Sequence, residues 1–246
     1  MAIPLRNNTG HYVTNYSTMG TKVILLNGPK LCGKDIAVSH LKKVGIPLVV
    51  RECKDSLHKI TQQLFCVSEE RYWEIYNNRE TKELPLPEFS LDINSIELDK
   101  LGDILKYDLS NRVGRAFRKD AGIIFYHNIN LSVREAVIYV SELICKPRFG
   151  DEYFGKARAN AIQDNEIVID GSCGFKEELA PLIKKVGMEN ILLIKIYRGG
   201  CTFDGDSRNY IPDGVIHNTK IIGNNFSEDS YLESIEQAVR EFLCLQ

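Results

Sequence analysis

The residues best suited to chemistry lie in one short stretch, Gly28-Pro29-Lys30-Leu31-Cys32-Gly33-Lys34-Asp35, which matches the pattern G-x-x-x-x-G-K. Its two glycines permit a tight backbone path that points successive N–H groups at a phosphate. Its second lysine is placed to bridge the β- and γ-phosphates, and a helix after the loop adds the positive end of its dipole. The stretch predicts a phosphate cradle for ATP, and the residues expected to contact the nucleotide are Gly28, Lys30, Cys32, Gly33, Lys34, Asp35 and Ile36.

Two aspartates are candidates for holding a metal ion. Asp35 stands where this pattern usually has Ser or Thr, and a carboxylate beside a triphosphate repels it unless Mg²⁺ lies between them. Asp170 ends the apolar run 166–170, and the carboxyl ends of parallel strands face the ligand crevice. We therefore expect Mg²⁺ near Asp35 and Asp170, with capping of the following turn as the alternative role for Asp170.

Phosphoryl transfer also needs cationic donors, because charge spreads over the transferring oxygens in the transition state. Arg198, after the apolar run 191–197, and Arg208, in a Gly- and Asp-rich loop, are placed where a lid would close over ATP. We assign them, with Lys34 and Asp170, to the catalytic group. The candidates for the phosphate of the acceptor are Arg51, Arg79, Arg134 and Arg148.

Two further residues are candidates for base recognition. Trp73 is placed to stack on an acceptor base, although its spacing with Tyr72 and Tyr76 fits the hydrophobic face of a helix as readily. Asn218 follows a short apolar run and is a candidate for reading the base of the donor, with a plain turn as the alternative.

The elements that must position these residues follow an α/β pattern. An apolar run precedes the glycine-containing stretch and amphipathic segments with a period near 3.6 alternate with further apolar runs. The expected strands are 22–27, 48–50, 166–170, 191–197 and 214–218, and the expected helices include 55–65, 132–145, 175–187 and 231–245. Ser132 and Glu135 have the spacing of a capping box, and Gly187 is a plausible C-cap. Such alternation predicts a parallel sheet with helices on both faces, a three-layer α/β fold.

Prolines and weak periodicity interrupt this alternation in the middle of the chain, which predicts an insertion. We expect residues 21–55 and 151–246 to form the core, 56–150 to form a largely helical acceptor-binding insertion, and 199–213 to form a lid. The polar residues 1–20 lack the apolar segment of a signal peptide and are expected to form a flexible tail.

Composition limits the classes of partner. The 31 basic and 33 acidic residues are interspersed, which argues against a broad surface for nucleic acid. Apolar runs all fall short of the roughly 18 residues needed to span a bilayer, so no membrane association is expected. Seven scattered cysteines favour a reduced, cytoplasmic chain over a disulfide scaffold or zinc site. We expect small-molecule nucleotides as partners and a monomer or homodimer.

The stretch Gly28–Asp35, with Asp after the lysine, resembles the deoxynucleoside monophosphate kinases of tailed bacteriophages, relatives of the P-loop nucleotide kinases. The resemblance runs from about residue 21 to the C-terminus. Further similar segments occur in the same order: Lys54-Asp55, Arg79-Glu80, Ser132-Val133-Arg134, Phe149-Gly150-Asp151, the strand ending in Asp170, Arg198 and the run 214–218. The chain departs from that pattern at Ile36, where a hydroxyl residue is common, and at residues 171–173, where an arginine is expected.

The resemblance implies a P-loop nucleotide-kinase fold and a function. It implies transfer of a phosphoryl group from ATP, with Mg²⁺, to deoxynucleoside monophosphates for viral DNA synthesis in the host cytoplasm. It also implies that Lys54 and Asp151 contribute to acceptor binding. The alternatives are a kinase for another phosphorylated acceptor such as dephospho-coenzyme A, a nucleotide-switch ATPase, and a structural protein whose loop binds nothing.

Overall fold

The computed structural model describes residues 5–6, 12–13, 20–106, 108–119, 124–204, 206 and 208–245. The chain divides into two compact units. The first comprises Met1–Cys53, Gly155–Asp204 and Arg208–Gln246, and the second comprises Lys54–Phe154 and Gly205–Ser207. Most of the tail expected at 1–20 lies outside the described residues; within it, β1 (Leu5–Arg6) pairs antiparallel with β2 (Tyr12–Val13).

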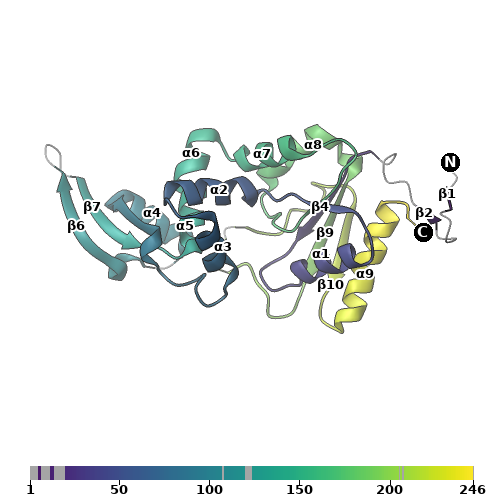
Figure 1. Ribbon diagram of the computed structural model, residues 1–246, viewed down its shortest axis with the longest axis horizontal. Helices are drawn as coiled ribbons and strands as arrows, with labels where there is room; N and C mark the ends of the chain where they lie inside the picture. The colour runs from purple at the N-terminus through teal and green to yellow at the C-terminus, as the bar shows by residue number, and fades with distance from the viewer. Residues whose placement is uncertain are drawn as a thin grey trace. The chain divides into compact units, whose positions relative to one another are not determined.

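A parallel sheet of five strands forms the centre of the first unit, in the order β10-β9-β3-β8-β4. Figure 1 labels β4, β9 and β10 of this sheet. Its strands are β3 (Lys22–Asn27), β4 (Leu48–Val50), β8 (Ile167–Asp170), β9 (Ile191–Tyr197) and β10 (Thr219–Gly223). The first strand in the chain, β3, is therefore central, with β8 and β9 on either side. Each strand's carboxyl end lies at the same edge of the sheet, so the loops that follow β3, β8 and β9 are neighbours.

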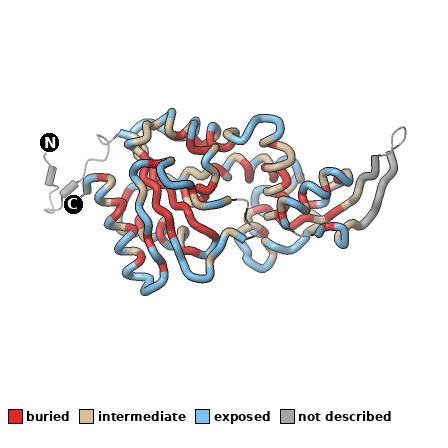
Figure 2. Tube along the Cα trace, turned by 180° about the vertical axis from the view of Figure 1, so that it is seen from behind, coloured by how far each residue is buried: buried red, intermediate tan, exposed pale blue. Residues whose placement is uncertain are grey.

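Helices cover both faces of this sheet, as the sequence predicts. Ile24 and Leu26 of β3 pack in one hydrophobic cluster with α1 (Lys34–Lys43) and α9 (Glu228–Phe242). Val23 and Leu25 point to the opposite face and pack with α8 (Leu179–Val186). Figure 2 shows the strands as buried lines between helices whose outer surfaces are exposed. The α/β class with a parallel sheet flanked by helices is confirmed.

Short elements complete the first unit. Helix α7 (Tyr153–Ala161) precedes β8, and single turns of 3-10 helix lie at Lys176–Glu178 and Met188–Asn190. Helix α8 ends at Gly187, whose φ of 83° is a left-handed value that glycine adopts without strain. Gly187 is thus the C-cap expected from the sequence.

The last strand lies later in the chain than the sequence predicts. Strand β10 is Thr219–Gly223, whereas residues 214–218 were expected to form it. Gly214 has a φ of 80°, and Thr219 donates its backbone N–H to the carbonyl of His217, so this segment turns instead. The strand is a short edge strand with three exposed positions, and its residues do not alternate between apolar and polar, so the strand signal in the sequence is weak.

The second unit contains, besides the helices expected for residues 56–150, an antiparallel sheet that the sequence pattern does not predict. Its helices are α2 (Lys54–Leu64), α3 (Glu69–Asn77), α4 (Ser95–Leu105), α5 (Val133–Tyr139) and α6 (Lys146–Phe149), with a π-helical segment at Val140–Cys145 and 3-10 turns at Pro87–Phe89 and Ser110–Arg112. An antiparallel sheet of order β5-β7-β6 joins β5 (Ser90–Asn94), β6 (Val113–Lys119) and β7 (Ile124–Asn130). Strands β6 and β7 are consecutive in the chain, whereas β5 pairs with β7 across about 40 residues (Ser90 with Asn130), a pairing that a local period does not reveal.

The capping box at the start of α5 is confirmed. The Ser132 hydroxyl accepts from the backbone N–H of Glu135 at 3.2 Å, and the Ser132 N–H donates to the Glu135 carboxylate at 2.7 Å. These bonds satisfy backbone donors that a helix start leaves without partners. The expected helix 132–145 therefore begins as predicted, and it continues in three helical segments to Phe149.

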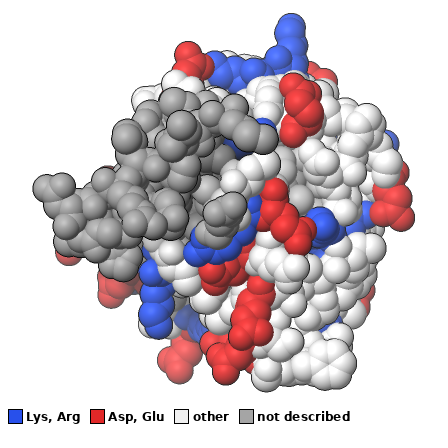
Figure 3. Space-filling model, turned by 90° about the vertical axis from the view of Figure 1, so that its right-hand side faces the viewer, with Lys and Arg blue, Asp and Glu red and all other residues white. Residues whose placement is uncertain are grey.

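The described surface carries charges of both signs. Figure 3 shows Lys and Arg side chains interspersed with Asp and Glu over the visible part of one face. Among the described residues, no helix combines the length and the apolar character required to cross a bilayer.

The packing of α7 generates a test of the first unit. A Cβ added at Gly155 would lie 2.5 Å from the carbonyl oxygen of Glu178 and 2.7 Å from its Cα. Alanine is the better helix former by about 1 kcal/mol, but the backbone contact reverses this preference, and we expect Gly155→Ala to lower the free energy of unfolding by about 1–3 kcal/mol.

Urea unfolding followed by circular dichroism measures this change. Gly223→Ala is the matched control, because its added Cβ would meet only Asn225 at 3.7 Å, an ordinary contact. Equal stability of the two variants would contradict the described approach of α7 to residue 178.

Candidate functional site

The glycine loop, residues 28–33, connects the central strand β3 to α1 and is closely packed at both ends. A Cβ at Gly28 would lie 2.6 Å from Cys32 Sγ and 2.8 Å from the Ile196 carbonyl oxygen. A Cβ at Gly33 would lie 2.6 Å from Asn224 Nδ2, and Gly33 has a φ of 111°. Both positions thus exclude a larger residue, which a chance glycine turn would not require.

Two residues from the end of the chain fix this loop. Asn224, directly after β10, donates from Nδ2 to the Cys32 carbonyl at 2.9 Å. Tyr231 of α9 donates its hydroxyl to the Gly33 carbonyl at 3.0 Å. Neither contact was predicted from the sequence, because each residue lies about two hundred positions from the loop and no local pattern marks it. The apolar residues directly before Asn224 were a signal that a strand ends there.

Lys34 curls back over the loop that precedes it. Its Nζ donates to the carbonyls of Gly28 and Pro29, both at 2.6 Å, and lies 3.6 Å from Cys32 Sγ. Burial lowers the pKa of this ammonium, and the charge of Arg208 lowers it further, while Cys32 acts in the opposite direction. A phosphate oxyanion would be a stronger acceptor for Lys34 than these neutral carbonyls.

The start of α1 presents backbone donors beside Lys34. The first bond within this helix runs from the N–H of Ala37 to the carbonyl of Gly33, and no side chain caps the helix. The N–H groups of Lys34, Asp35 and Ile36 therefore have no partner in the helix ladder. The side chains of Asp35 and Ile36 are exposed at this end.

Two arginines reach the same region from other elements. Arg198, after β9, donates from Nη1 to the Leu31 carbonyl at 2.9 Å. Arg208 donates from Nη1 to the Ser172 carbonyl at 3.4 Å and is close enough to Lys34 to lower its pKa. The structure thus brings together three of the four residues assigned to the catalytic group.

Asp170, the fourth, is fully buried at the end of β8 and is engaged by protein donors. One carboxylate oxygen accepts from the N–H and the hydroxyl of Ser172, at 2.6 and 2.7 Å, and the other pairs with Arg158. Burial alone would lower the pKa of Arg158, but the Asp170 carboxylate reverses this effect and raises it. These contacts favour the turn-capping role of Asp170 over direct metal binding.

A hollow of about 250 Å³ lies beside the glycine loop. Its lining residues are Ile36, Arg198, Gly199, Asn224, Asn225, Phe226 and Glu228. Phe226 is 91% exposed there.

Asn218 was expected to read the base of the donor, but it lies at the amino ends of the strands. It precedes β10 and donates to the Glu189 carbonyl, so this expectation is corrected. Asn224 and Asn225 occupy the carboxyl end instead.

The candidates for acceptor binding lie on several different elements. Arg51 follows β4 and makes two hydrogen bonds to the Glu166 carboxylate, at 2.6 and 3.0 Å. Arg134 lies 3.6 Å from Glu83 and 3.7 Å from Asp206. Lys54 begins α2, and Arg79, Arg148 and Asp151 are exposed on separate segments of the second unit.

Trp73 belongs to an aromatic cluster in the second unit. Its ring lies edge-on to His58 at 5.1 Å and to Tyr76 at 5.5 Å. His58 Nδ1 lies 2.7 Å from the hydroxyl of Tyr72, which is fully buried. These contacts are those of a helix face packed into a core, and stacking of Trp73 on a base stays a prediction.

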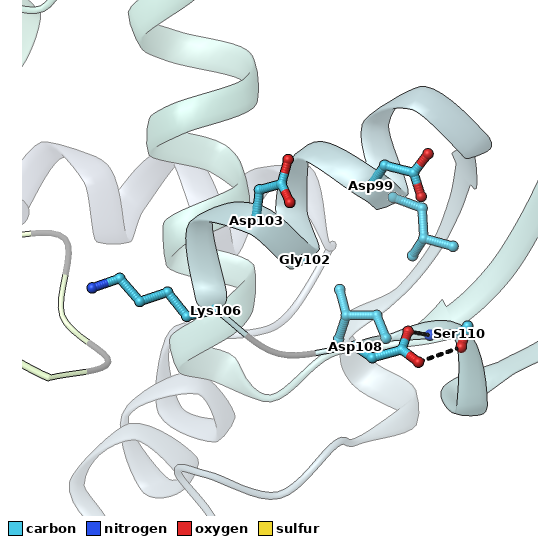
Figure 4. A pocket seen from close by; sticks show the side chains of 8 residues that line it. Asp99, Gly102, Asp103, Lys106, Asp108 and Ser110 are labelled. Carbon is cyan, nitrogen blue, oxygen red and sulfur yellow. Dashed lines mark hydrogen bonds between the residues drawn. The ribbon is translucent and has the colours of Figure 1, made fainter.

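A larger hollow, about 440 Å³, lies beside α4 in the second unit. Figure 4 shows Asp99 and Asp103 on α4, with Lys106 extending away from them, and Asp108 bonded to Ser110. Within the part of the chain that the structure describes, no three His, Cys, Asp or Glu side chains are grouped to hold a metal ion.

The buried histidine of the aromatic cluster predicts a pH dependence of stability. Burial, assisted by the charges of Lys54 and Lys82, lowers the pKa of His58 from 6.5 to about 3. Between these values the unfolded chain binds a proton that the folded chain does not, so stability falls as the pH is lowered through this window. The expected slope for this group is about 1.4 kcal/mol per pH unit.

Urea unfolding at several pH values between 7 and about 4.5, for the wild type and for His58→Gln, separates this histidine from the carboxylates. The difference in unfolding free energy between the two proteins should shrink or reverse as the pH falls. A constant difference across the range would show that His58 protonates in the folded protein.

Comparison with known proteins gives no relative from which a role of this site could be transferred. No protein-family model matches the chain, and no curated protein matches its sequence. The structure itself provides a glycine loop at the end of a central parallel strand, a partly desolvated lysine, and two arginines beside it. This arrangement of donors is suited to a bound polyphosphate.

Proposed function

We propose that this protein transfers a phosphoryl group from ATP to a deoxynucleoside monophosphate, as a P-loop nucleotide kinase. One observation carries the proposal: Gly28 and Gly33 are both held too close to their neighbours for a side chain, and Lys34 follows them at the start of α1. Close backbone approach, free N–H groups and a lysine are the parts that grip a triphosphate.

The donor phosphates would be bound by these groups in turn. The N–H groups at the start of α1 would point at the β-phosphate, and Lys34 would exchange the carbonyls of Gly28 and Pro29 for β- and γ-oxygens. Arg198 and Arg208 add two positive charges beside the same loop. In this proposal, these donors would stabilise the negative charge that develops during transfer.

Asp35 is the residue that fits Mg²⁺ in this arrangement. Its side chain is exposed in the first turn of α1, next to the expected phosphates. Mg²⁺ keeps several waters and is usually held by one or two carboxylates with the substrate phosphates, so a cluster of protein ligands is not required. Bound Mg²⁺ would neutralise charge on the β- and γ-oxygens.

The acceptor needs no general base, because its phosphate is already a nucleophilic oxyanion. Attack of an acceptor oxygen on the γ-phosphorus forms the new P–O bond as the bond to the β-phosphate oxygen breaks, and ADP leaves. The protein's contribution is positioning and charge stabilisation.

The choice of deoxynucleoside monophosphates as acceptors rests on the resemblance to the bacteriophage kinases, in the loop and in the segments around Arg79, Arg134 and Asp151.

A release assay for ADP, with Mg·ATP and each of dAMP, dCMP, dGMP, dTMP, CMP, GMP and dephospho-coenzyme A, tests the proposal. We expect turnover that requires a deoxynucleotide acceptor. Lys34→Ala should lower kcat by about 10²–10³-fold, the loss typical of removing one donor to a transition-state oxyanion. Lys43→Ala is the matched control, because Lys43 is exposed at the opposite end of α1.

The outcomes distinguish the alternatives. Turnover with dephospho-coenzyme A alone would replace the acceptor and keep the kinase. ATP hydrolysis without any acceptor would favour the nucleotide-switch ATPase. Absence of both turnover and stabilisation by Mg·ATP in a thermal melt would favour a structural protein.

The hollow beside the loop predicts a role for Phe226 toward the adenine of ATP. Phe226 is 91% exposed and lines the hollow with Ile36 and Arg198, so its ring is available to stack on a base. Phe226→Ala should raise the KM for ATP by about 5- to 100-fold, the range that corresponds to loss of one base–aromatic stack.

Binding of inorganic tripolyphosphate separates base from phosphate recognition. It should be unchanged in Phe226→Ala and weakened in Lys34→Ala. Ile221→Ala, at an exposed position of the edge strand β10, is the control. Equal weakening of ATP and tripolyphosphate by Phe226→Ala would exclude base stacking.

A further inference from the structure

Asn27, the last residue of β3, joins three segments at the carboxyl edge of the sheet. Its side chain is fully buried. Nδ2 donates to the carbonyls of Cys173 at 3.0 Å and Asn209 at 3.1 Å, and Oδ1 accepts from the N–H of Ile211 at 2.8 Å. One amide immediately before the glycine loop therefore ties the loop after β8 to the segment that contains Arg208.

The backbone of Gly174 packs closely against the side chain of Arg208. A Cβ at Gly174 would lie 2.5, 2.8 and 2.9 Å from Cβ, Cγ and Cδ of Arg208. The N–H of Asn209 donates to the Gly174 carbonyl at 3.1 Å, and the guanidinium donates to the Ser172 carbonyl. The stem of Arg208 thus lies flat on the backbone of this loop.

The segment after Arg208 is anchored at further points along β9. The hydroxyl of Tyr210 donates to the Ile196 carbonyl at 2.8 Å, and the Tyr210 ring stacks on Tyr197 with centroids 4.3 Å apart. The buried ammonium of Lys195 donates to the Asp213 carboxylate at 2.6 Å. Residues 208–213 are therefore fastened to the sheet, although 199–213 as a whole was expected to be a lid.

We propose that Asn27 and Gly174 are positioning residues, which hold the Arg208 guanidinium at the phosphate site before a nucleotide binds. This inference rests on the proposed function. Arg208 then differs from an arginine carried in by a closing lid, because closure would leave residues 208–213 in place. A donor that is already oriented needs no reorganisation at the moment of transfer, which is the condition for strong charge stabilisation.

The buried ion pair between Asp170 and Arg158 helps to hold the loop that carries Gly174 in position. Asp170 accepts from the N–H and the hydroxyl of Ser172, and this fixes the path of residues 171–174. Arg158 balances the charge of Asp170 and donates to the Glu178 carbonyl at 3.1 Å. The loop that carries Gly174 is thereby held at its start by Asp170 and at Cys173 by Asn27.

A double-mutant cycle tests the proposal. Kcat and KM for ATP are measured for the wild type, Gly174→Ala, Arg208→Ala and the double variant, with the best acceptor from the release assay. We expect Gly174→Ala to lower kcat by about 10- to 100-fold with little change in KM, and to cause less than about a threefold further loss when Arg208 is already absent.

Gly171→Ala is the matched control in the same loop, since its added Cβ would meet only the end of the Glu52 side chain at 3.2 Å. Asn27→Ala provides a second cycle if Gly174→Ala does not fold, and should also speed amide hydrogen exchange at Ile211. Equal losses from Gly174→Ala with and without Arg208 would overturn the positioning role and leave the kinase intact. A wild type that neither turns over nor binds Mg·ATP would overturn both.

Discussion

The contact between the Lys34 ammonium and the carbonyls of its own loop is the interaction on which the site depends. For Nζ to reach Gly28 and Pro29 at 2.6 Å, the chain must reverse direction within five residues. That reversal uses left-handed backbone at Leu31, with a φ of 65°, and at Gly33. The result is a partly buried cation whose described hydrogen bonds go to neutral acceptors, and an anion would be a stronger partner for it.

Negative charge is kept away from this cation by the arrangement of the neighbouring strand. Asp170 stands at the end of β8, but Arg158 compensates its charge within a buried pair, and Ser172 occupies its other oxygen. Both oxygens of the Asp170 carboxylate thus already accept hydrogen bonds from Arg158 and Ser172. Removing Arg158 would leave an uncompensated buried charge, which is more costly than the pair is worth. The pair thus supports the electropositive character of the loop as well as the fold.

The sequence predicts the features that depend on local pattern. The run before the glycine loop, the capping box at Ser132 and the C-cap at Gly187 are all encoded within a few residues, and all are confirmed. The addition of β5 to the antiparallel sheet and the register of β10 on β9 depend on pairing with other segments of the chain, so periodicity alone does not place them. Asn224 and Arg158 were missed because their contacts, to Cys32 and to Asp170 and Glu178, are created only by the fold.

The ion pairs of Arg51 and Arg134 bear on how an acceptor phosphate would reach either guanidinium. A phosphate must displace any carboxylate that already holds a guanidinium. Arg51 is held by two short hydrogen bonds to Glu166, whereas Arg134 lies 3.6 and 3.7 Å from its two carboxylates, a looser geometry. Short bidentate pairs are the stronger ones. An acceptor phosphate bound at Arg51 would therefore have to displace the Glu166 carboxylate from two short hydrogen bonds, which would offset part of what the new contact contributes.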